Sequence, residues 1–180
     1  MIYKISWLIR ALLYKSFFFE IGFLSYLGKP KYIYGFRKIN IGSRVRIMPG
    51  LRFEVHGDGK LVISDNCSIG NDLHVAAGGH LIISSGALIS SCVLITDIDH
   101  NYTQFGVPVF DQEVKINKTF IGRNVFIGAG AKILAGTFVG DGCVIGANAV
   151  VRGHFPAGSV IVGAPARVHK SYDLVKKQWH

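Results

Sequence analysis

The stretch IGRNVFIGAGAKILAGTFVGDGCVIGANAVV, residues 121–151, repeats itself every six residues. An aliphatic side chain leads each repeat, at Ile121, Ile127, Ile133, Val139, Ile145 and Val151. A small or short residue follows four positions later, at Val125, Ala131, Thr137, Cys143 and Ala149. A period of six matches neither an α-helix, with about 3.6 residues per turn, nor a plain strand, with a period of about 2. It predicts a parallel β-helix, in which each repeat forms one flat side of a coil and stacked coils bury the aliphatic row.

The same period extends toward the N-terminus. Aliphatic or aromatic residues recur every six positions in three shorter series: Ile41, Ile47 and Phe53; Ile63, Ile69, Val75 and Leu81; Ile83, Ile89 and Ile95. The sequence His56-Gly-Asp-Gly59 interrupts the first two with a turn signature. Three sides of six residues make a coil of about eighteen, so we expect about five coils in an all-β domain over residues 39–170.

Composition restricts the partners of this domain. A chain of 180 residues suits one domain, and a charged fraction of only 17% indicates that subunits or lipid cover part of the surface. The three cysteines form no CxxC pair, and Cys67 and Cys143 fall on interior repeat positions, which favours reduced thiols in a cytosolic protein. The repeat region has no dense basic stripe, so nucleic acid is not an expected partner.

The N-terminal arm, residues 1–38, lies outside the repeat. Apolar residues at Ile2, Ile5, Leu8, Ile9, Leu12 and Leu13 fall on one face of a helix, with Lys4, Arg10 and Lys15 off it. Charges interrupt every apolar run, so no segment approaches the roughly 20 residues that span a bilayer. Residues 1–28 therefore lie in a membrane interface as a basic amphipathic helix or cap the open end of the β-helix. Both can also hold together, with Phe17–Phe19 in the core and the basic face towards lipid.

The repeat breaks between Thr96 and Lys118. This segment has no period, and it carries Asp97, Asp99, His100 and other polar residues. An insertion of about twenty residues in a regular solenoid is usually functional, so we expect a loop at 96–118 that bears the chemistry. After Val151 the series ends, and residues 171–180 are predicted to form a short C-terminal helix.

Three features together resemble one family. They are the six-residue series, the loop with Thr96-Asp-Ile-Asp-His100, and the closing Val162-Gly-Ala-Pro-Ala-Arg167-Val. Over about residues 40–170 the chain is similar to the left-handed β-helix acyltransferases, and more narrowly to the sugar O-acetyltransferases of the galactoside, maltose and surface-polysaccharide group. The resemblance implies a left-handed parallel β-helix that assembles as a homotrimer. It further implies that acetyl-CoA binds between neighbouring subunits, that the acceptor is a carbohydrate, and that no metal is required.

The resemblance also implies roles for individual residues. His100 is at the position of the family's catalytic His, and an imidazole titrates in the range that suits removal of a proton from a sugar hydroxyl. Asp97 and Asp99 flank it, and one of them either orients the imidazole or binds acceptor hydroxyls, unless they only cap the loop. The pantetheine arm of coenzyme A would lie against positions that correspond to Ala129, Gly130 and Ala147. The phosphates of coenzyme A would meet Arg152, Arg167 and Lys170. The acceptor would bind to Asn71, Asp72 and Phe126.

Two other classes of function remain as alternatives. A γ-type carbonic anhydrase shares the fold and binds zinc through three His, for which His74, His80 and His100 are the candidates, at unfavourable spacing. A non-catalytic β-helix would bind or scaffold without acetyl-CoA. A third option keeps acetyl-CoA but changes the acceptor, as in sugar N-acetyltransferases or serine acetyltransferases. Both are disfavoured, because the first usually carry an extra N-terminal nucleotide-binding domain and the second a longer helical one. We expect a cytoplasmic O-acetyltransferase of surface-glycan biosynthesis, at or near the inner face of the membrane.

Overall fold

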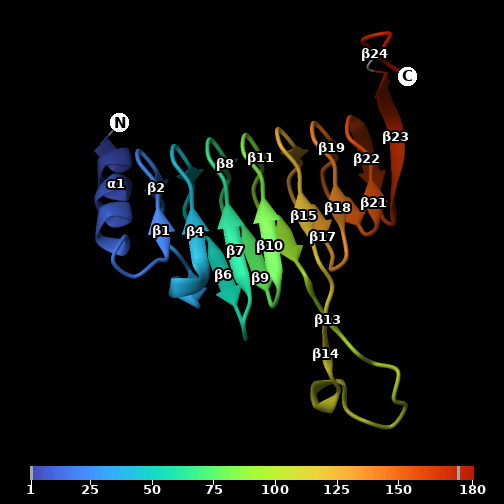
Figure 1. The fold of residues 1–180 in the computed structure, drawn as a ribbon, viewed down its shortest axis with the longest axis horizontal. Coiled ribbons are helices and arrows are strands. Elements are labelled where there is room, and N and C mark those ends of the chain that lie inside the picture. The colour runs from blue at the N-terminus through green and yellow to red at the C-terminus, as the bar shows by residue number, and fades with distance from the viewer. Residues whose placement is uncertain (1, 174) are drawn as a thin grey trace.

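The structure is a computed structural model that describes residues 2–173 and 175–180, with side chains from residue 5 onward. Short parallel strands stack in three sheets, A, B and C, and the chain visits them in turn to wind a parallel β-helix (Figure 1). Helix α1 (Ile2–Tyr14) lies at one end of the stack, and the C-terminal strands lie at the other. The predicted positions of Ile2 and Lys4 on the helix face fall outside the described side chains.

The strands of each sheet follow one another along the solenoid axis. Sheet A contains β1 (Glu20–Ile21), β4 (Ile39–Ile41), β7 (Lys60–Ile63), β10 (His80–Ile83), β15 (Phe120–Ile121), β18 (Phe138–Val139) and β21 (His154–Phe155). Sheet B contains β2 (Tyr26–Leu27), β5 (Arg46–Ile47), β8 (Ser68–Ile69), β11 (Leu88–Ile89), β16 (Phe126–Ile127), β19 (Val144–Ile145), β22 (Ser159–Gly163), β23 (Ala166–Asp173) and β24 (Gln178–Trp179). Sheet C contains β3 (Tyr32–Tyr34), β6 (Arg52–Val55), β9 (His74–Ala77), β12 (Leu94–Thr96), β17 (Lys132–Ile133) and β20 (Val150–Val151). A separate hairpin pairs β13 (Ile98–His100) with β14 (Val114–Ile116), and short 3-10 turns occupy Phe36–Lys38 and Val109–Asp111.

The core is the interior of the coil, as the repeat predicts. The leading aliphatic residues from Ile121 to Val151 and the small residues four positions after them are all buried, as are the thiols of Cys67 and Cys143. Each corner turns through a residue with positive φ just before the small residue, for example Asn124 (φ 54°) and Gly130 (φ 73°). Asn and Gly tolerate this left-handed conformation, which explains why they recur there.

The β-helix begins earlier than the sequence suggested. β1, β2 and β3 pair in parallel with β4, β5 and β6, so residues 20–34 form a complete coil that we had assigned to the arm. Ile21, Leu27 and Ile33 keep the period of six, but the surrounding aromatic residues obscured it. The boundary at residue 38 is therefore wrong, and the solenoid has coils at both ends beyond the five expected.

Helix α1 caps the first coil with only one side. Ala11 is buried, the Trp7 ring packs on Tyr26 at 5.8 Å between centroids, and Arg10 Nη1 donates to the Leu27 carbonyl at 3.0 Å. The predicted apolar face points outward instead, and of the three phenylalanines only Phe18 is buried. No helix in the described part of the chain has the length and hydropathy to cross a membrane.

The C-terminal helix predicted over residues 171–180 is wrong. β23 runs antiparallel to β22 through Ser171, and β24 folds back on β23, with Tyr172 opposite Trp179. The two rings pack edge to face at 5.2 Å between centroids. Pairing with the exposed edge of β22 and the aromatic contact outweigh the weak helical preference of this short segment.

Candidate active site

The hairpin β13–β14 leaves the solenoid at the corner between sheets C and A (Figure 1). The ladder is unbroken behind it, because β10 pairs with β15 and β12 with β17. The Thr119 hydroxyl donates to the Thr96 carbonyl at 2.8 Å and joins the two ends of the excursion. The break in the repeat therefore marks a projecting hairpin on an intact scaffold.

Asp97 fixes the base of this hairpin. It is fully buried, and its Oδ1 and Oδ2 accept the backbone N–H groups of Gly78 at 2.7 Å and Gly79 at 3.0 Å. A Cβ on Gly78 would lie 2.3 Å from Ile116 Cδ1, so the glycine lets the hairpin approach the coil. The carboxylate is thus occupied by the protein backbone, which supports the loop-capping alternative for Asp97 and removes it from direct catalysis.

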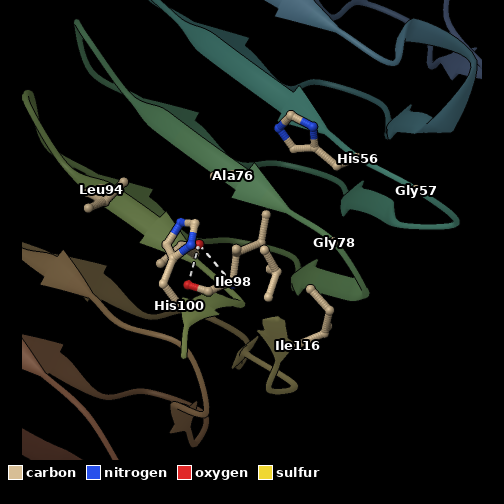
Figure 2. A pocket seen from close by; sticks show the side chains of 10 residues that line it. His56, Gly57, Ala76, Gly78, Leu94, Ile98, His100 and Ile116 are labelled. Atoms are coloured by element: carbon tan, nitrogen blue, oxygen red, sulfur yellow. Dashed lines mark hydrogen bonds between the residues drawn. The ribbon is translucent and has the colours of Figure 1, made fainter. Parts of the chain in front are cut away.

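A cavity of about 700 Å³ opens between the hairpin and the outer face of sheet C. Its size is typical of a small-molecule site. The hairpin supplies one wall and the N-terminal coils the other, and the lining residues are His56, Gly57, Ala76, Gly78, Leu94, Thr96, Ile98, His100, Val114 and Ile116. Figure 2 shows the imidazoles of His56 and His100 on opposite sides of the cavity. An apolar pocket with two imidazoles at its rim suits a proton transfer in a partly dry site.

His100 is exposed at the end of β13. Its backbone N–H donates to Asp99 Oδ1 at 3.0 Å, and within the described part of the chain no side chain hydrogen-bonds its imidazole. The ring is therefore available to a substrate or to a second subunit.

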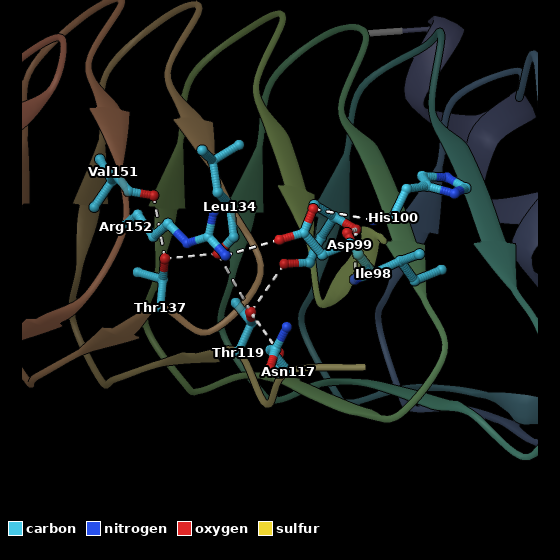
Figure 3. Close-up of polar contacts among 10 residues, drawn as sticks. Ile98, Asp99, His100, Asn117, Thr119, Leu134, Thr137, Val151 and Arg152 are labelled. Atoms are coloured by element: carbon cyan, nitrogen blue, oxygen red, sulfur yellow. Dashed lines mark hydrogen bonds and ion pairs between the residues drawn. The ribbon is translucent and has the colours of Figure 1, made fainter. Parts of the chain in front are cut away.

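Asp99 connects the hairpin to the C-terminal coils. Its Oδ2 accepts Arg152 Nη2 at 2.7 Å, across the corner where β20 ends (Figure 3). In Figure 3 the His100 ring points away from this pair. Both side chains are partly exposed, so the pair contributes little to stability and mainly sets the direction of the hairpin. Of the two aspartates beside His100, Asp99 is the one with an oxygen near the surface.

A polar cluster that we did not predict adjoins the cavity on sheet C. Glu54 Oε1 accepts from Arg52 Nε at 2.5 Å and lies 2.9 Å from His74 Nε2, and its Oε2 lies 3.8 Å from His56 Nε2. The hydrogen bond from Arg52, and then that from His74, keep the pKa of the Glu54 carboxyl below its ordinary value. Glu54 is therefore ionised at neutral pH and holds three basic side chains in place.

The residues predicted to bind coenzyme A lie on other parts of the C-terminal coils. Ala129 and Gly130 turn between β16 and β17, and Ala147 turns between β19 and β20, one coil further. The two corners are in contact, since the Asn148 N–H donates to the Ala129 carbonyl at 2.8 Å. They form the edge of sheet C opposite the corner that carries the hairpin, so the outer face of sheet C connects them to His100.

Arg167 and Lys170 lie on β23, opposite Val162 and Val160, and both are exposed. Neither lines the cavity. Arg167 donates to the neighbouring Ala166 carbonyl, which leaves most of its guanidinium free.

The predicted acceptor residues do not reach the cavity within one chain. Asn71 and Asp72 lie at the corner after β8, where Asp72 pairs with Lys31 at 2.6 Å. Phe126 is exposed on the outer face of sheet B, beside Leu88. Asn71 and Asp72 thus share the corner between sheets B and C with Ala129 and Ala147, while Phe126 faces outward from sheet B, and none of the three lines the cavity.

Two of the three histidines proposed as zinc ligands lie on different sheets. His74 lies on sheet C beside Glu54, whereas His80 lies on sheet A, opposite Lys60. No group of His, Cys, Asp and Glu side chains suited to a metal ion occurs among the residues described.

Several known proteins are similar to this chain in sequence or fold. The family profile described as "Bacterial transferase hexapeptide (six repeats)" matches residues 118–153. WbbJ of Escherichia coli K12, provisionally named a lipopolysaccharide biosynthesis O-acetyl transferase, is 35% identical over 159 residues, which span 83% of this chain and 80% of WbbJ. The dTDP-4-amino-4,6-dideoxy-D-glucose acyltransferase of Escherichia coli is 34% identical over 139 residues, 74% of this chain and 72% of that enzyme.

Among solved structures, a point mutant of AntD, an N-acyltransferase from Bacillus cereus in complex with dTDP and coenzyme A, superposes with a TM-score of 0.76. The two chains are 23% identical, and the match covers 92% of this chain and 90% of AntD. The fold is thus the left-handed parallel β-helix expected from the resemblance.

The chain belongs to the hexapeptide-repeat transferases and is an acyltransferase. The match to the dTDP-4-amino-4,6-dideoxy-D-glucose acyltransferase covers 72% of that enzyme, so an extra N-terminal domain is no ground for setting amino-sugar acceptors aside.

Proposed function

We propose that this protein transfers the acetyl group of acetyl-CoA to a hydroxyl of a sugar during the biosynthesis of a surface polysaccharide. The observation that carries the proposal is the position of His100, which stands free at the rim of a cavity in a chain related to WbbJ over most of its length. A glycan acceptor is further supported by the polar and aromatic side chains that continue the cavity wall along sheet C.

In the proposed reaction His100 accepts the proton of the sugar hydroxyl while the hydroxyl oxygen attacks the thioester carbonyl. The carbon–sulfur bond then breaks, and the thiolate of coenzyme A takes up the proton from His100. The products are an acetyl ester and the free thiol. A general base of this kind contributes roughly 10²–10⁴ in rate.

The donor would lie along the outer face of sheet C, with its pantetheine arm at the corner of Ala129, Gly130 and Ala147. These residues leave little side chain above the backbone, so a backbone N–H there would meet the negative charge on the thioester oxygen. Arg167 and Lys170 are free to bind phosphates. Arg152 is a weaker candidate because Asp99 already occupies it.

A homotrimer would complete the site. The tip of the hairpin exposes three aromatic rings, Tyr102, Phe105 and Phe110, which are 75–105% exposed in the single chain. The tip is nevertheless ordered from within, since Gln112 is buried and donates to the carbonyls of Gln104 and Val107. A rigid apolar tip that projects from the scaffold suits the surface of a neighbouring subunit.

A second function is favoured by the dTDP-amino-sugar acyltransferase of Escherichia coli. Like that enzyme, this protein would acylate an amine on a nucleotide-linked sugar, with the same imidazole as base. The two functions differ in the bond formed, because mild alkali cleaves an acetyl ester and leaves an acetamide intact.

The decisive experiment uses glycan from a strain that lacks the gene. Purified protein and acetyl-CoA are incubated either with this glycan or with dTDP-4-amino-4,6-dideoxyglucose, and the products are analysed by mass spectrometry before and after mild alkali. We expect the glycan to gain alkali-labile acetyl groups. An alkali-stable acetyl group on the nucleotide sugar alone would contradict O-acetylation and establish the second function.

We also propose that helix α1 binds the cytoplasmic face of the membrane. Ile5, Leu8, Ile9, Leu12 and Leu13 form an outward apolar face with exposures of 36–66%, and Phe17, Phe19 and Phe23 extend it. Residues 1–40 carry seven basic side chains and one acid. Apolar surface beside an excess of basic charge suits an interface of anionic lipid.

Point variants on this face test the membrane contact. Leu12→Glu/Leu13→Glu places two charges on exposed sites, so the fold is retained while the free energy of lipid insertion is lost. In flotation with vesicles of phosphatidylcholine and phosphatidylglycerol, we expect the wild type to rise with the lipid and the variant to stay at the bottom. Val168→Glu/Val175→Glu, two exposed sites at the far end, is the matched control and should float. Equal flotation of all three would refute the contact.

A further inference from the structure

The outer face of sheet C continues the wall of the cavity beyond His56. Tyr34, Glu54, Ala76 and Thr96 stand in one row on four successive coils, because Tyr34 pairs with Glu54, Glu54 with Ala76 and Ala76 with Thr96. The last two of these line the cavity. The row therefore leads from the site of His100 toward the N-terminal coils without a change of face.

An aromatic ring and an imidazole stand side by side at the far end of this row. The Tyr34 ring lies 5.2 Å from the His56 ring, between centroids, and is half exposed. Arg52 lies over the ring of Tyr32 at 5.7 Å. Figure 2 shows His56 at the edge of the cavity. Tyr34 lies on the preceding coil, opposite Glu54.

The hydrogen-bonding groups beside these rings are held in fixed positions. Glu54 accepts from Arg52 and lies within hydrogen-bond distance of His74, and its side chain is only 16% exposed. The side chains of Arg52, His56 and His74 are 37–50% exposed, so a ligand on this face can reach them, and Glu54 holds them in place before the ligand binds. Pre-set polar groups beside an aromatic face match a sugar ring, which has an apolar C–H face and hydroxyl groups at its edge.

The charge of the cluster selects among ligands. The Glu54 carboxylate, to which Arg52 Nε donates, balances the positive charge of the Arg52 guanidinium, so the cluster offers little net positive charge to a diphosphate. A nucleotide-linked sugar would require unpaired cations here, whereas a neutral glycan requires none.

We propose that Tyr34, Glu54 and His56 form a subsite for a neutral sugar next to the one that is acetylated. The acceptor is then a chain of at least two sugars, and the enzyme selects for it. This inference rests on the proposed function, of which it specifies the substrate class.

The test compares acceptors of different length. Glycan from the gene-deletion strain is cut into fragments, separated by length, and acetylated with acetyl-CoA to obtain kcat/KM for each. For the wild type we expect kcat/KM to rise by about tenfold from single sugars to longer fragments, the size of one aromatic contact with its neighbouring hydrogen bond. Tyr34→Ala should remove most of this rise.

Phe138→Ala is the matched control, because Phe138 is also a partly exposed ring that stacks on an imidazole, His154, at 4.6 Å, but on sheet A. It should keep the dependence on length. The inference is overturned if the wild type acetylates single sugars as well as longer fragments, or if Tyr34→Ala lowers kcat/KM equally for all lengths. It is also overturned if dTDP competes with the glycan and Tyr34→Ala abolishes that competition, which would assign the subsite to a nucleotide. If no fragment of any length is acetylated, the proposed function itself fails.

Discussion

His100→Ala is expected to lower kcat for acetyl transfer by roughly 10²–10⁴ while leaving the fold and assembly intact. The imidazole is exposed and has no side-chain partner within the described part of the chain, so its removal breaks no contact that supports the hairpin. The hydroxyl must then attack without a base. The rate is measured as release of coenzyme A thiol with the deletion-strain glycan as acceptor, and the assembly by size-exclusion chromatography with light scattering.

His154→Ala provides the comparison for His100→Ala. His154 is likewise exposed, but it lies on sheet A against Phe138 and away from the cavity. It should retain the wild-type rate within about twofold. If His100→Ala is as active as His154→Ala, then His100 is not the base, and His56 across the cavity becomes the next candidate.

Asp97→Ala is expected to destabilise the protein by about 3 kcal/mol and to lower the midpoint of thermal unfolding by roughly 6–12 °C. Its carboxylate accepts two backbone N–H groups at a fully buried position, and alanine leaves both without a partner. The base of the hairpin then loosens, so acetyl transfer should fall as well. Circular dichroism gives the midpoint, and hydrogen exchange of the Gly78 and Gly79 amides reports the local opening.

Asp141→Ala is the control for Asp97→Ala, because it removes a similar hydrogen bond at an exposed position. Asp141 also accepts a backbone N–H, from Arg123 at 2.7 Å, but it is 43% exposed. Water replaces the lost acceptor there, so we expect a cost under about 1 kcal/mol. Similar losses in the two variants would contradict the anchoring role of Asp97.

The regular part of the fold was predictable because one rule governs it. A strict period of six places each leading aliphatic residue inside the coil, and the small residue after each corner must also be buried, as Cys143 and Ala149 are. The first coil was missed although Ile21, Leu27 and Ile33 obey the rule. Apolar and aromatic residues dominate that region, so the period did not stand out.

The candidate site was predictable only where it lies in one stretch of sequence. His100 and Asp99 were found because they share the broken segment, whereas His56 and Glu54 come from another coil. Their place opposite the hairpin depends on the coil lengths, which are 20 residues from Glu20 to Asn40 and 22 from Asn40 to Val62. We had assumed eighteen throughout, as holds between Phe120 and Phe138, and that error hides which side chains are neighbours across coils.

The uninterrupted ladder behind the hairpin has an evolutionary consequence. Because β10 and β15 pair directly and the Thr119 hydroxyl donates to the Thr96 carbonyl, the hairpin connects β12 to β15 without taking part in the stacking of the coils. Such a connection can lengthen, shorten or change its sequence without shifting the register of any coil, provided that its buried root at Asp97 is kept. We therefore expect this segment to vary more in evolution than the coils that support it.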